Sequence, residues 1–309
     1  MKLLTFERIS HPNGGHRLGL LWPGGAIIDL REAANELALR SLPTSMVEYL
    51  EGGAFTRETV QVIVERAEEF SARHTDFVFS AQQVHLRSPL PRPASLRKFS
   101  VSESHYRALC SHCGRRPSGD WKKSPRFVYR NHQAVYGGDA TIPKPAAGKQ
   151  LDLEFGIACV IGQAGMNIPA EEAMACVAGF TISNCWSLRD LEADEFNLRL
   201  GPSKSQDFAT SLGPYLVSDE EAGDIESLAM QIRINGVPLG SSRSGNSVWS
   251  WGQLIAAASQ DVPLFPGDIL CMSDPGGSLM EFRKDGWLQS GDQIELEVEN
   301  LGILKNSVE

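Results

Sequence analysis

Two thiols and an imidazole lie close together at residues 110–113 (CSHC). Groups of these types at this spacing make half of a zinc site, and a structural zinc ion needs four closed ligands. No second C-x-x-C pair follows, and His132 is the only later imidazole. The sequence therefore favours a loop without zinc between residues 105 and 127. This loop is locally basic although the chain is acidic, so it could cover a pocket.

Other reactive side chains gather in three later segments. The segments are residues 184–190 (NCWSLRD), 201–208 (GPSKSQDF) and 274–281 (DPGGSLME). Their carboxylates, cations and thiol are the groups that acid–base, electrostatic and nucleophilic catalysis use. Cys185 could be a nucleophile, although a buried cysteine is more often a small apolar side chain. Arg189 could be an ordinary ion-pair partner of Asp190. Lys204 could pair with Asp207 in the same way.

The composition excludes several classes of protein. The 309 residues are 42% hydrophobic and 22% charged, as in ordinary globular domains. The net charge of −9 argues against nucleic-acid binding, and no run of about 18 apolar residues could span a membrane. The 6 cysteines are scattered and do not form a disulfide framework. Glu7 and Arg8 stand where a signal peptide needs apolar residues, so we expect a reduced, cytoplasmic protein.

Residues 1–85 are expected to form a small α/β domain ahead of the reactive segments. Apolar spacing predicts strands near residues 1–8, 17–22 and 26–30, and helices over residues 31–39, 46–49 and 57–70. The prolines of residues 89–93 then indicate an extended connector. We therefore place the domain boundary between residues 85 and 86.

Residues 86–309 are expected to form a larger, β-rich α+β domain. Short β-type runs occur at residues 153–161, 230–234 and 294–298, and helical stretches at residues 170–176 and 251–259. The chain contains 29 glycines and 17 prolines, which favour many turns over a doubly wound parallel sheet. Nucleotide-binding loops and zincin motifs are absent from the sequence.

The reactive segments, together with residues 151–154 (LDLE) and 266–270 (PGDIL), resemble the fumarylacetoacetate hydrolase family in order and spacing. The resemblance covers residues 85–309, and the first 85 residues resemble more weakly the small domain of bacterial members. It implies a mixed β-sandwich roll, usually a homodimer. It also implies hydrolysis, decarboxylation or isomerisation of a small carbonyl or enol substrate through an enolate. A divalent Mg²⁺, Mn²⁺ or Ca²⁺ ion, held by four carboxylates, normally assists this chemistry in the family.

Four catalytic residues carry over from the family. Its water-activating histidine resembles His105, and the glutamate partner of that histidine resembles Glu281. The enolate-stabilising cations resemble Arg189 and Lys204. A histidine held by a carboxylate suits general-base catalysis, because the acid fixes the tautomer and supports the imidazolium. Glu103, which precedes His105 in the same motif, is assigned to the substrate pocket.

The family's metal ligands do not carry over. Lys98, Gly156 and Cys185 stand at three ligand positions, and only Glu154 remains. One carboxylate cannot supply the oxygen ligands of Mg²⁺, so we expect no metal cofactor. A buried Glu154 then needs another positive partner. We expect the ammonium of Lys98 to take the place of the ion and to face the cavity that holds His105.

Two further substitutions add acidic residues to the expected pocket. Asp274 replaces a threonine that contacts a substrate carboxylate in the family, and it would repel such a group. Glu192 replaces a common glutamine. The resulting hypothesis is a metal-independent acid–base enzyme acting on a small carbonyl compound. Two alternatives remain: a non-catalytic homologue that binds a metabolite or a partner, and an ordinary metal-dependent acylpyruvate hydrolase with substitute ligands.

Overall fold

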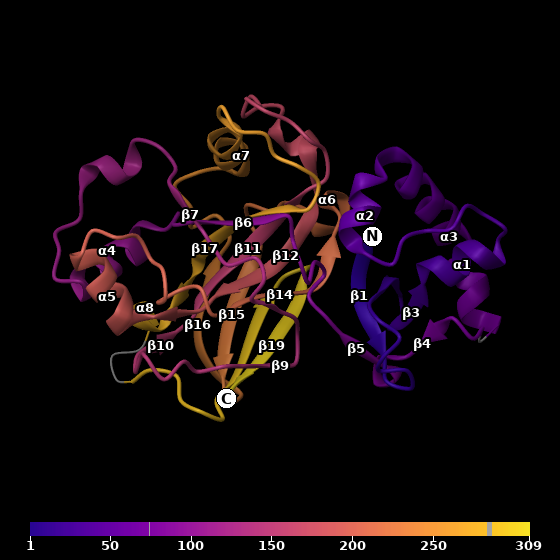
Figure 1. The fold of residues 1–309 in the computed structure, drawn as a ribbon, viewed down its shortest axis with the longest axis horizontal. Coiled ribbons are helices and arrows are strands. Elements are labelled where there is room, and N and C mark those ends of the chain that lie inside the picture. The colour runs from indigo at the N-terminus through magenta and orange to yellow at the C-terminus, as the bar shows by residue number, and fades with distance from the viewer. Residues whose placement is uncertain (74, 283–285) are drawn as a thin grey trace.

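A computed structural model describes residues 1–73, 75–282 and 286–309. Figure 1 shows a small N-terminal region, drawn in indigo, beside a larger body built from two sheets. Strands outnumber helices among the described residues, so the expected α+β, β-rich class is confirmed. None of the helices among the described residues combines the length and apolarity needed to cross a bilayer.

The described residues of the N-terminal region form five strands and three α-helices. They are β1 (Lys2–Arg8), β2 (Arg17–Trp22), β3 (Ala26–Asp29), α1 (Leu30–Glu36), α2 (Met46–Glu51), α3 (Gly53–Arg73), β4 (Val78–Phe79) and β5 (Val84–Leu86). The carboxylate of Asp29 caps α1 by accepting hydrogen bonds from the first backbone amides of the helix. Along α3, Val60, Ile63, Ala67 and Phe70 recur every three or four residues and are buried, as an amphipathic helix requires.

One sheet runs through both regions of the chain. The other strands of this sheet are β6 (Ser95–Phe99), β7 (Phe127–Tyr129), β8 (Val135–Tyr136), β11 (Glu154–Ile161), β12 (Val177–Cys185), β14 (Thr210–Val217) and β17 (Asp268–Ser278). Its main path is β4-β3-β2-β1-β14-β12-β11-β17-β6-β7, with β5 on β1 and β8 on β14. The junction is the antiparallel pairing of Leu3 with Leu216 and of Lys2 with Val217. The expected domain boundary falls inside β5, and the sheet continues across it.

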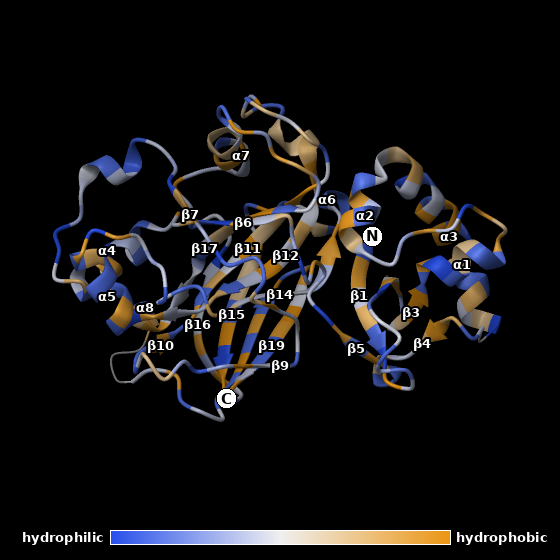
Figure 2. Ribbon diagram, viewed as in Figure 1, coloured by the Kyte–Doolittle hydropathy of each residue, from blue (hydrophilic) through white to orange (hydrophobic). Residues whose placement is uncertain are grey.

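A second sheet packs against the first to form a sandwich. It contains β9 (Ala140–Ile142), β15 (Ala229–Ile234), β16 (Val237–Arg243), β18 (Gln293–Val298) and β19 (Gly302–Val308), and a short pair joins β10 (Leu151–Asp152) to β13 (Ser187–Leu188). The remaining helices are α4 (Glu103–His112), α5 (Arg189–Asn197), α6 (Asp219–Ala222), α7 (Trp251–Ser259) and α8 (Leu279–Phe282). Figure 2 shows hydrophobic residues concentrated in the strands and hydrophilic residues in the peripheral loops.

Strand β11 is buried on both faces, which explains its nearly continuous apolar sequence. Ile157, Cys159 and Ile161 face the core of the sandwich, whereas Ala158 and Val160 belong to a second core beneath the N-terminal helices. Side chains alternate along a strand, so Glu154 lies on the same face as Ala158. The buried polar residues around Glu154 therefore lie at the edge of this second core, where β11 begins.

Two expectations about local structure need correction. Residues 170–176 do not form an α-helix, and only Ala173–Cys176 make a short 3₁₀ turn. The segment that contains His105 is helix α4 rather than a loop, because Ser102 caps its first turn and its backbone hydrogen bonds continue to Cys113.

Candidate active site

His105 and Glu281 meet between α4 and α8. Nδ1 of His105 lies 3.2 Å from Oε2 of Glu281, and the imidazole is 1% exposed. The hydroxyls of Ser104 and Ser278 donate to the same carboxylate at 2.8 and 3.2 Å. These bonds hold the Glu281 carboxylate against the imidazole, which is the geometry expected of a general base and its orienting acid.

Asp274 positions the chain that leads into α4. Its carboxylate accepts hydrogen bonds from the hydroxyl of Ser100 at 2.7 Å and from the backbone amides of Val101 and Ser102 at 2.8 and 3.0 Å. Both oxygens are used, and the residue is 1% exposed. Asp274 therefore anchors the start of the helix that carries His105, and its role as a residue that repels a substrate carboxylate is not supported by this geometry.

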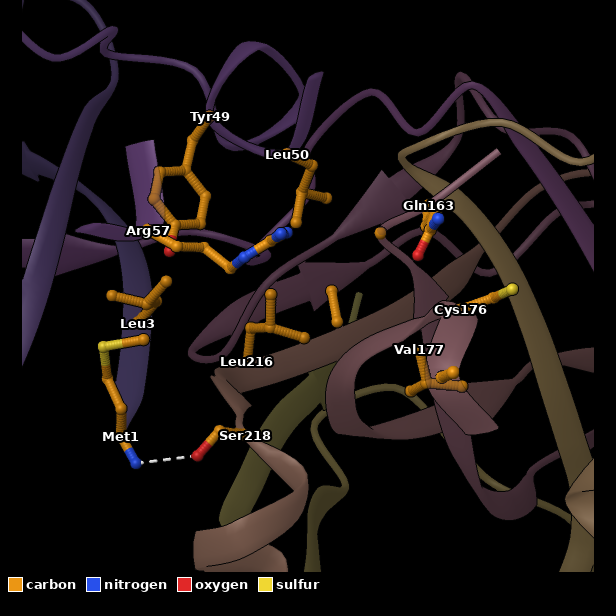
Figure 3. Close-up of a pocket in the computed structure, with 13 residues that line it drawn as sticks. Met1, Leu3, Tyr49, Leu50, Arg57, Gln163, Cys176, Val177, Leu216 and Ser218 are labelled. Atoms are coloured by element: carbon orange, nitrogen blue, oxygen red, sulfur yellow. Dashed lines mark hydrogen bonds between the residues drawn. The ribbon is translucent and has the colours of Figure 1, made fainter. Parts of the chain in front are cut away.

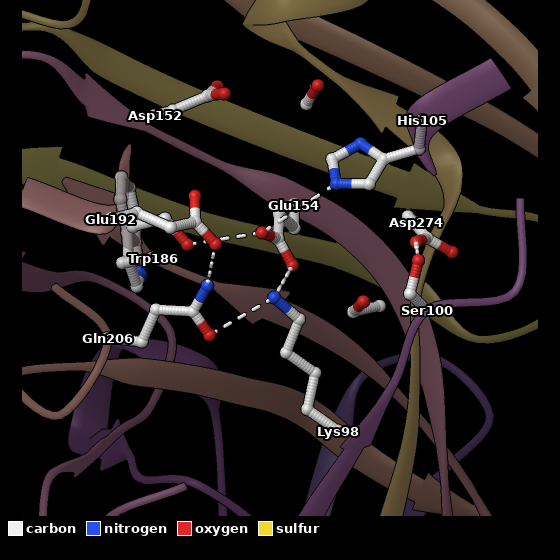
Figure 4. Close-up of polar contacts among 12 residues, drawn as sticks. Lys98, Ser100, His105, Asp152, Glu154, Trp186, Glu192, Gln206 and Asp274 are labelled. Carbon is white, nitrogen blue, oxygen red and sulfur yellow. Dashed lines mark hydrogen bonds and ion pairs between the residues drawn. The ribbon is translucent and has the colours of Figure 1, made fainter. Parts of the chain in front are cut away.

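The ammonium of Lys98 forms a buried ion pair with Oε2 of Glu154. Lys98 is 7% exposed and Glu154 is fully buried. The same ammonium donates to Oε1 of Gln206 at 3.1 Å, and Nε2 of Gln206 donates to Glu192 at 2.6 Å. Figure 4 shows His105 and Lys98 approaching Glu154 from two sides, with Nε2 of His105 at 3.8 Å from Oε1 of Glu154.

Arg189 lies at the centre of a buried set of carboxylates. Its Nε donates to Asp152 at 2.8 Å, and its Nη1 donates to Glu154 at 2.8 Å and to Glu192 at 2.6 Å. The side chain is completely buried, and among the described residues its Nη2 has no hydrogen-bond partner. The guanidinium thus offsets the charge of these carboxylates and keeps one donor unused.

Opposing effects set the pKa values of this cluster. Burial lowers the pKa of His105, but the hydrogen bond with Glu281 and the charges of Asp274 and Glu154 outweigh burial and hold it above its usual value. Burial raises the pKa of Glu154, but Lys98 and Arg189 overcome this and hold it well below its usual value. Glu154 therefore stays ionised at neutral pH, and His105 keeps its proton to a higher pH than an ordinary histidine.

Several known proteins are similar to this chain in sequence. Residues 99–309 match the model of the fumarylacetoacetate (FAA) hydrolase C-terminal domain. The mitochondrial oxaloacetate tautomerase of Bos taurus is 31% identical over 100% of this chain and 91% of its own length. The oxaloacetate tautomerase YisK of Bacillus subtilis is 29% identical over 94% of this chain and 95% of its own.

The chain belongs to the fumarylacetoacetate hydrolase family. Solved structures show the same fold: a fumarylacetoacetate hydrolase from Exiguobacterium antarcticum has a TM-score of 0.73 at 21% identity, covering 100% of this chain and 99% of that one. A 5-carboxymethyl-2-hydroxymuconate delta-isomerase from Mycobacterium smegmatis has a TM-score of 0.70 at 20% identity, with the same coverage. The expected family fold is confirmed, and the protein is an enzyme of a family whose chemistry proceeds through enolates.

The residues at the family's metal site do not fit a divalent cation. Oε2 of Glu154 faces the ammonium of Lys98, and Oε1 accepts from Arg189 and from Ser187. A Cβ atom on Gly156 would lie 1.7 Å from the carbonyl oxygen of Met272, so this backbone has no room for the family's second glutamate. Over the described residues no group of three or more histidine, cysteine or acidic side chains is arranged to hold a metal ion, Cys110 and Cys113 included.

Cys185 is completely buried and lies next to Cys271. The neighbouring Cys271 thiol, followed by the charges of Arg130 and Lys98, lowers the pKa of Cys185 although burial opposes this. The residue packs in the second core rather than facing solvent. A thiol is a poor ligand for the hard cations of this family, so the replacement removes one more oxygen from the site.

Two predicted site residues lie outside the buried cluster that Glu154 forms with Lys98, His105 and Arg189. The ammonium of Lys204 is on the surface, with a side chain that is 76% exposed and bonded to Asp207 at 2.7 Å. Glu103 is also at the surface, where it pairs with Arg107 and Lys122. The structure thus corrects both placements, and for Lys204 the ordinary ion pair considered in the sequence analysis is the one observed. Glu192 and Cys185 lie in or beside the cluster as expected.

Three members of the cluster were not predicted from the sequence. Gln206 joins Lys98 to Glu192, and Arg130 donates to the same amide oxygen at 2.9 Å. Asp152 accepts from Arg189 and from the backbone amide of Leu279. Gln206 lies in the motif of residues 201–208 and Asp152 in that of residues 151–154, so their place in these motifs could have identified them as site residues. Arg130 lies outside every motif, and only the packing of β7 against β6 brings it to the site.

Proposed function

We propose that this enzyme interconverts the keto and enol forms of a small 2-oxo acid without a divalent cation. Relatives are named as oxaloacetate tautomerases, which makes oxaloacetate the first substrate to test. One observation supports the proposal above all others. Nε2 of His105 and Nζ of Lys98 approach the two oxygens of Glu154 from opposite sides, so a proton carrier and a fixed cation face one small region.

Lys98 would stabilise the oxygen on which negative charge develops. A lysine ammonium has three donors. One faces Glu154 and a second donates to Gln206, and no third partner is present among the described residues. The remaining donor would bind the carbonyl oxygen of the substrate. A cation fixed in a buried site stabilises an enolate more strongly than water does, because the field is not screened.

His105 would carry the proton between carbon and oxygen. In its neutral form, Nε2 takes a proton from the carbon next to the carbonyl, the C–H electron pair becomes the C=C bond, and the carbonyl oxygen becomes an enolate. The imidazolium then returns this proton to the oxygen and gives the enol. The reverse sequence converts the enol to the ketone. Glu281 supports the imidazolium and fixes the ring orientation through Nδ1.

Substrate access requires part of the cover to move. His105 is 1% exposed and Lys98 is 7% exposed, so neither reaches bulk solvent in this structure. The enclosed state favours a second candidate function, namely binding of a metabolite without turnover, because Lys98 and Gln206 occupy the centre of the site. The two candidates differ in a measurable way, since only the first accelerates tautomerisation.

The test follows the decay of enol oxaloacetate by its ultraviolet absorbance, using protein that was dialysed against a chelator. The proposal expects acceleration by the wild type and almost none by His105→Ala. If the wild-type protein accelerates the reaction of neither oxaloacetate nor any member of a panel of 2-oxo and β-diketo acids, the proposed activity is wrong. Metabolite binding without turnover is then the function that remains. Activity that disappears with chelator and returns with Mg²⁺ would contradict the metal-independent mechanism.

We also propose that the protein is a homodimer, as members of this family usually are. Light scattering during size-exclusion chromatography measures the mass in solution directly. A mass of about one chain at micromolar concentration would contradict this proposal.

A further inference from the structure

A pocket of about 280 Å³ lies between the N-terminal region and the main body of the molecule, far from the proposed active site. Leu3 of β1, Leu50 of α2 and Leu216 of β14 line it, together with residues from the start of β12. Gly162 and Gln163 close it just beyond the last residue of β11, whereas Glu154 is the first residue of that strand. At about 3.3 Å per residue, the two sites are roughly 25 Å apart.

The walls of this pocket combine apolar side chains with nearly as much polar surface. Figure 3 shows Leu3, Leu50, Val177 and Leu216 around its interior. The amino group of Met1 is already bound to the hydroxyl of Ser218 at 2.8 Å, so the polar contact at this edge is satisfied. Such walls would hold a hydrocarbon chain or ring, because burial of apolar surface is favourable at about 25 cal/mol per Å².

Two polar side chains at the pocket, Tyr49 and Arg57, have no hydrogen-bond or ion-pair partner among the residues that the structure describes. Tyr49 is 3% exposed, and over the described residues its hydroxyl makes no hydrogen bond. Burial raises the pKa of Tyr49 to about 12, with Arg57 opposing part of the change, so this hydroxyl remains a donor at neutral pH. Arg57 extends past Tyr49 toward the pocket in Figure 3, and no carboxylate among the described residues pairs with it.

We propose that this pocket is a second binding site, specific for a small monocarboxylate with an apolar chain or ring. The carboxylate would accept hydrogen bonds from Arg57 and Tyr49, and the apolar part would lie against Leu3, Leu50 and Leu216. A guanidinium matches the planar geometry of a carboxylate, which favours this anion over a cation or a neutral sugar. The volume lies just below the usual range of about 300–1,000 Å³, which limits the ligand to a small molecule.

The proposal does not depend on the proposed function, because no residue of the cluster around Glu154 lines this pocket. The test is a ligand-observed NMR titration with hexanoate, and 1-hexanol serves as the uncharged match of the same chain length. We expect saturable binding of hexanoate to the wild type and binding of 1-hexanol that is at least about tenfold weaker, as loss of hydrogen bonds to a charged group implies.

Substitutions locate the site. Arg57→Gln should weaken hexanoate binding by roughly ten- to a hundredfold, and Tyr49→Phe by roughly two- to tenfold, since the hydroxyl contributes one hydrogen bond. Arg66→Gln is the matched control, because Arg66 lies on the same helix but pairs with Glu69 at the surface, and its affinity should equal that of the wild type. Circular dichroism of each variant establishes that the fold is retained.

Three results would overturn the proposal. The first is the absence of hexanoate binding to the wild type at millimolar concentration. The second is equal affinity for hexanoate and 1-hexanol, which would show an apolar hollow without a carboxylate site. The third is unchanged affinity in a folded Arg57→Gln protein, which would place the bound hexanoate elsewhere.

Discussion

Lys98 and Glu154 form an ion pair inside the protein, at the position where the family carries a divalent cation. Glu154 is completely buried, and an isolated carboxylate in such surroundings is very unfavourable. In the family, the cation neutralises several carboxylate ligands. Here Glu154 is the one that remains at those positions, and Lys98 and Arg189 pair with it. We propose that the substitutions at positions 98, 156 and 185 belong together, with the fixed charge of Lys98 in the place of a bound ion.

Removal of Lys98 should destabilise the fold. Lys98→Met leaves Glu154 with Arg189 as its remaining cation, and breaking a buried ion pair costs about 3–5 kcal/mol, of which Arg189 offsets a part. Urea unfolding of the variant measures the loss. Lys204→Met removes an exposed ion pair and is the control, with an expected change within about 0.5 kcal/mol. Equal effects for the two variants would show that the buried pair has no special weight.

His105 should be essential for catalysis and dispensable for folding. His105→Ala should lower kcat by about 10²–10⁴-fold, the usual contribution of a general base. His112→Ala is the matched control, because His112 lies on the same helix at its far end, against Trp287. A folded His105→Ala protein with the wild-type rate would assign the imidazole a purely structural role.

The pH dependence of the reaction rate should reflect the contact between His105 and Glu281. When His105 acts as the base, the rate in the keto-to-enol direction rises as pH increases through the pKa of His105, which lies above its usual value. The hydrogen bond with Glu281 is the largest effect that raises this pKa, and burial opposes it. Glu281→Gln should therefore shift the rising limb of the pH–rate profile to lower pH. A shift to higher pH would contradict the assignment.

The metal site should not be restored by adding metal. Isothermal titration of millimolar Mg²⁺ into the dialysed protein should give no saturable binding, because Glu154 is the only carboxylate left at the four ligand positions. Turnover should change less than about twofold between chelator and excess Mg²⁺, since no step of the proposed mechanism uses a Lewis acid. Saturable binding that is lost in Glu154→Gln would refute this prediction.

Gly156 should tolerate no side chain. Gly156→Ala places a Cβ atom 1.7 Å from the carbonyl oxygen of Met272, so β11 and β17 would have to separate. We expect a loss of at least about 1–3 kcal/mol in the free energy of unfolding, as for an overpacked core. Gly201→Ala is the control, because a Cβ atom there meets nothing within 4 Å. A neutral Gly156→Ala substitution would show that the strands adjust easily.

The sequence predicted most elements that repeat a simple pattern. Strands β15 and β18 and helices α3 and α7 follow from apolar spacing, because their burial is periodic. Strand β11 follows from its continuous apolar run, because both of its faces are buried. Helix α4 was missed, since its polar first turn depends on the cap at Ser102 and on the anchor at Asp274.

The site was predicted where charge balance determines a contact. Lys98 was expected beside Glu154 for this reason, and the ion pair is present. Lys204 was placed in the cluster by its motif alone, but the turn that carries it directs its side chain to solvent. Gln206 and Arg130 come from distant segments, and only tertiary packing shows that Lys98 and Arg130 both donate to the amide oxygen of Gln206.

The pairing of β1 with β14 has a consequence for the solubility of the chain. Leu216 and Val217 of β14 are hydrogen-bonded to the first strand of the molecule, and Leu216 is almost fully buried. Without the N-terminal residues, this part of β14 would become an uncovered sheet edge with unpaired backbone groups and an apolar surface. Such edges template aggregation in β proteins. The N-terminal region therefore protects the catalytic sheet from pairing with other chains, and a truncated protein that starts near residue 86 should precipitate.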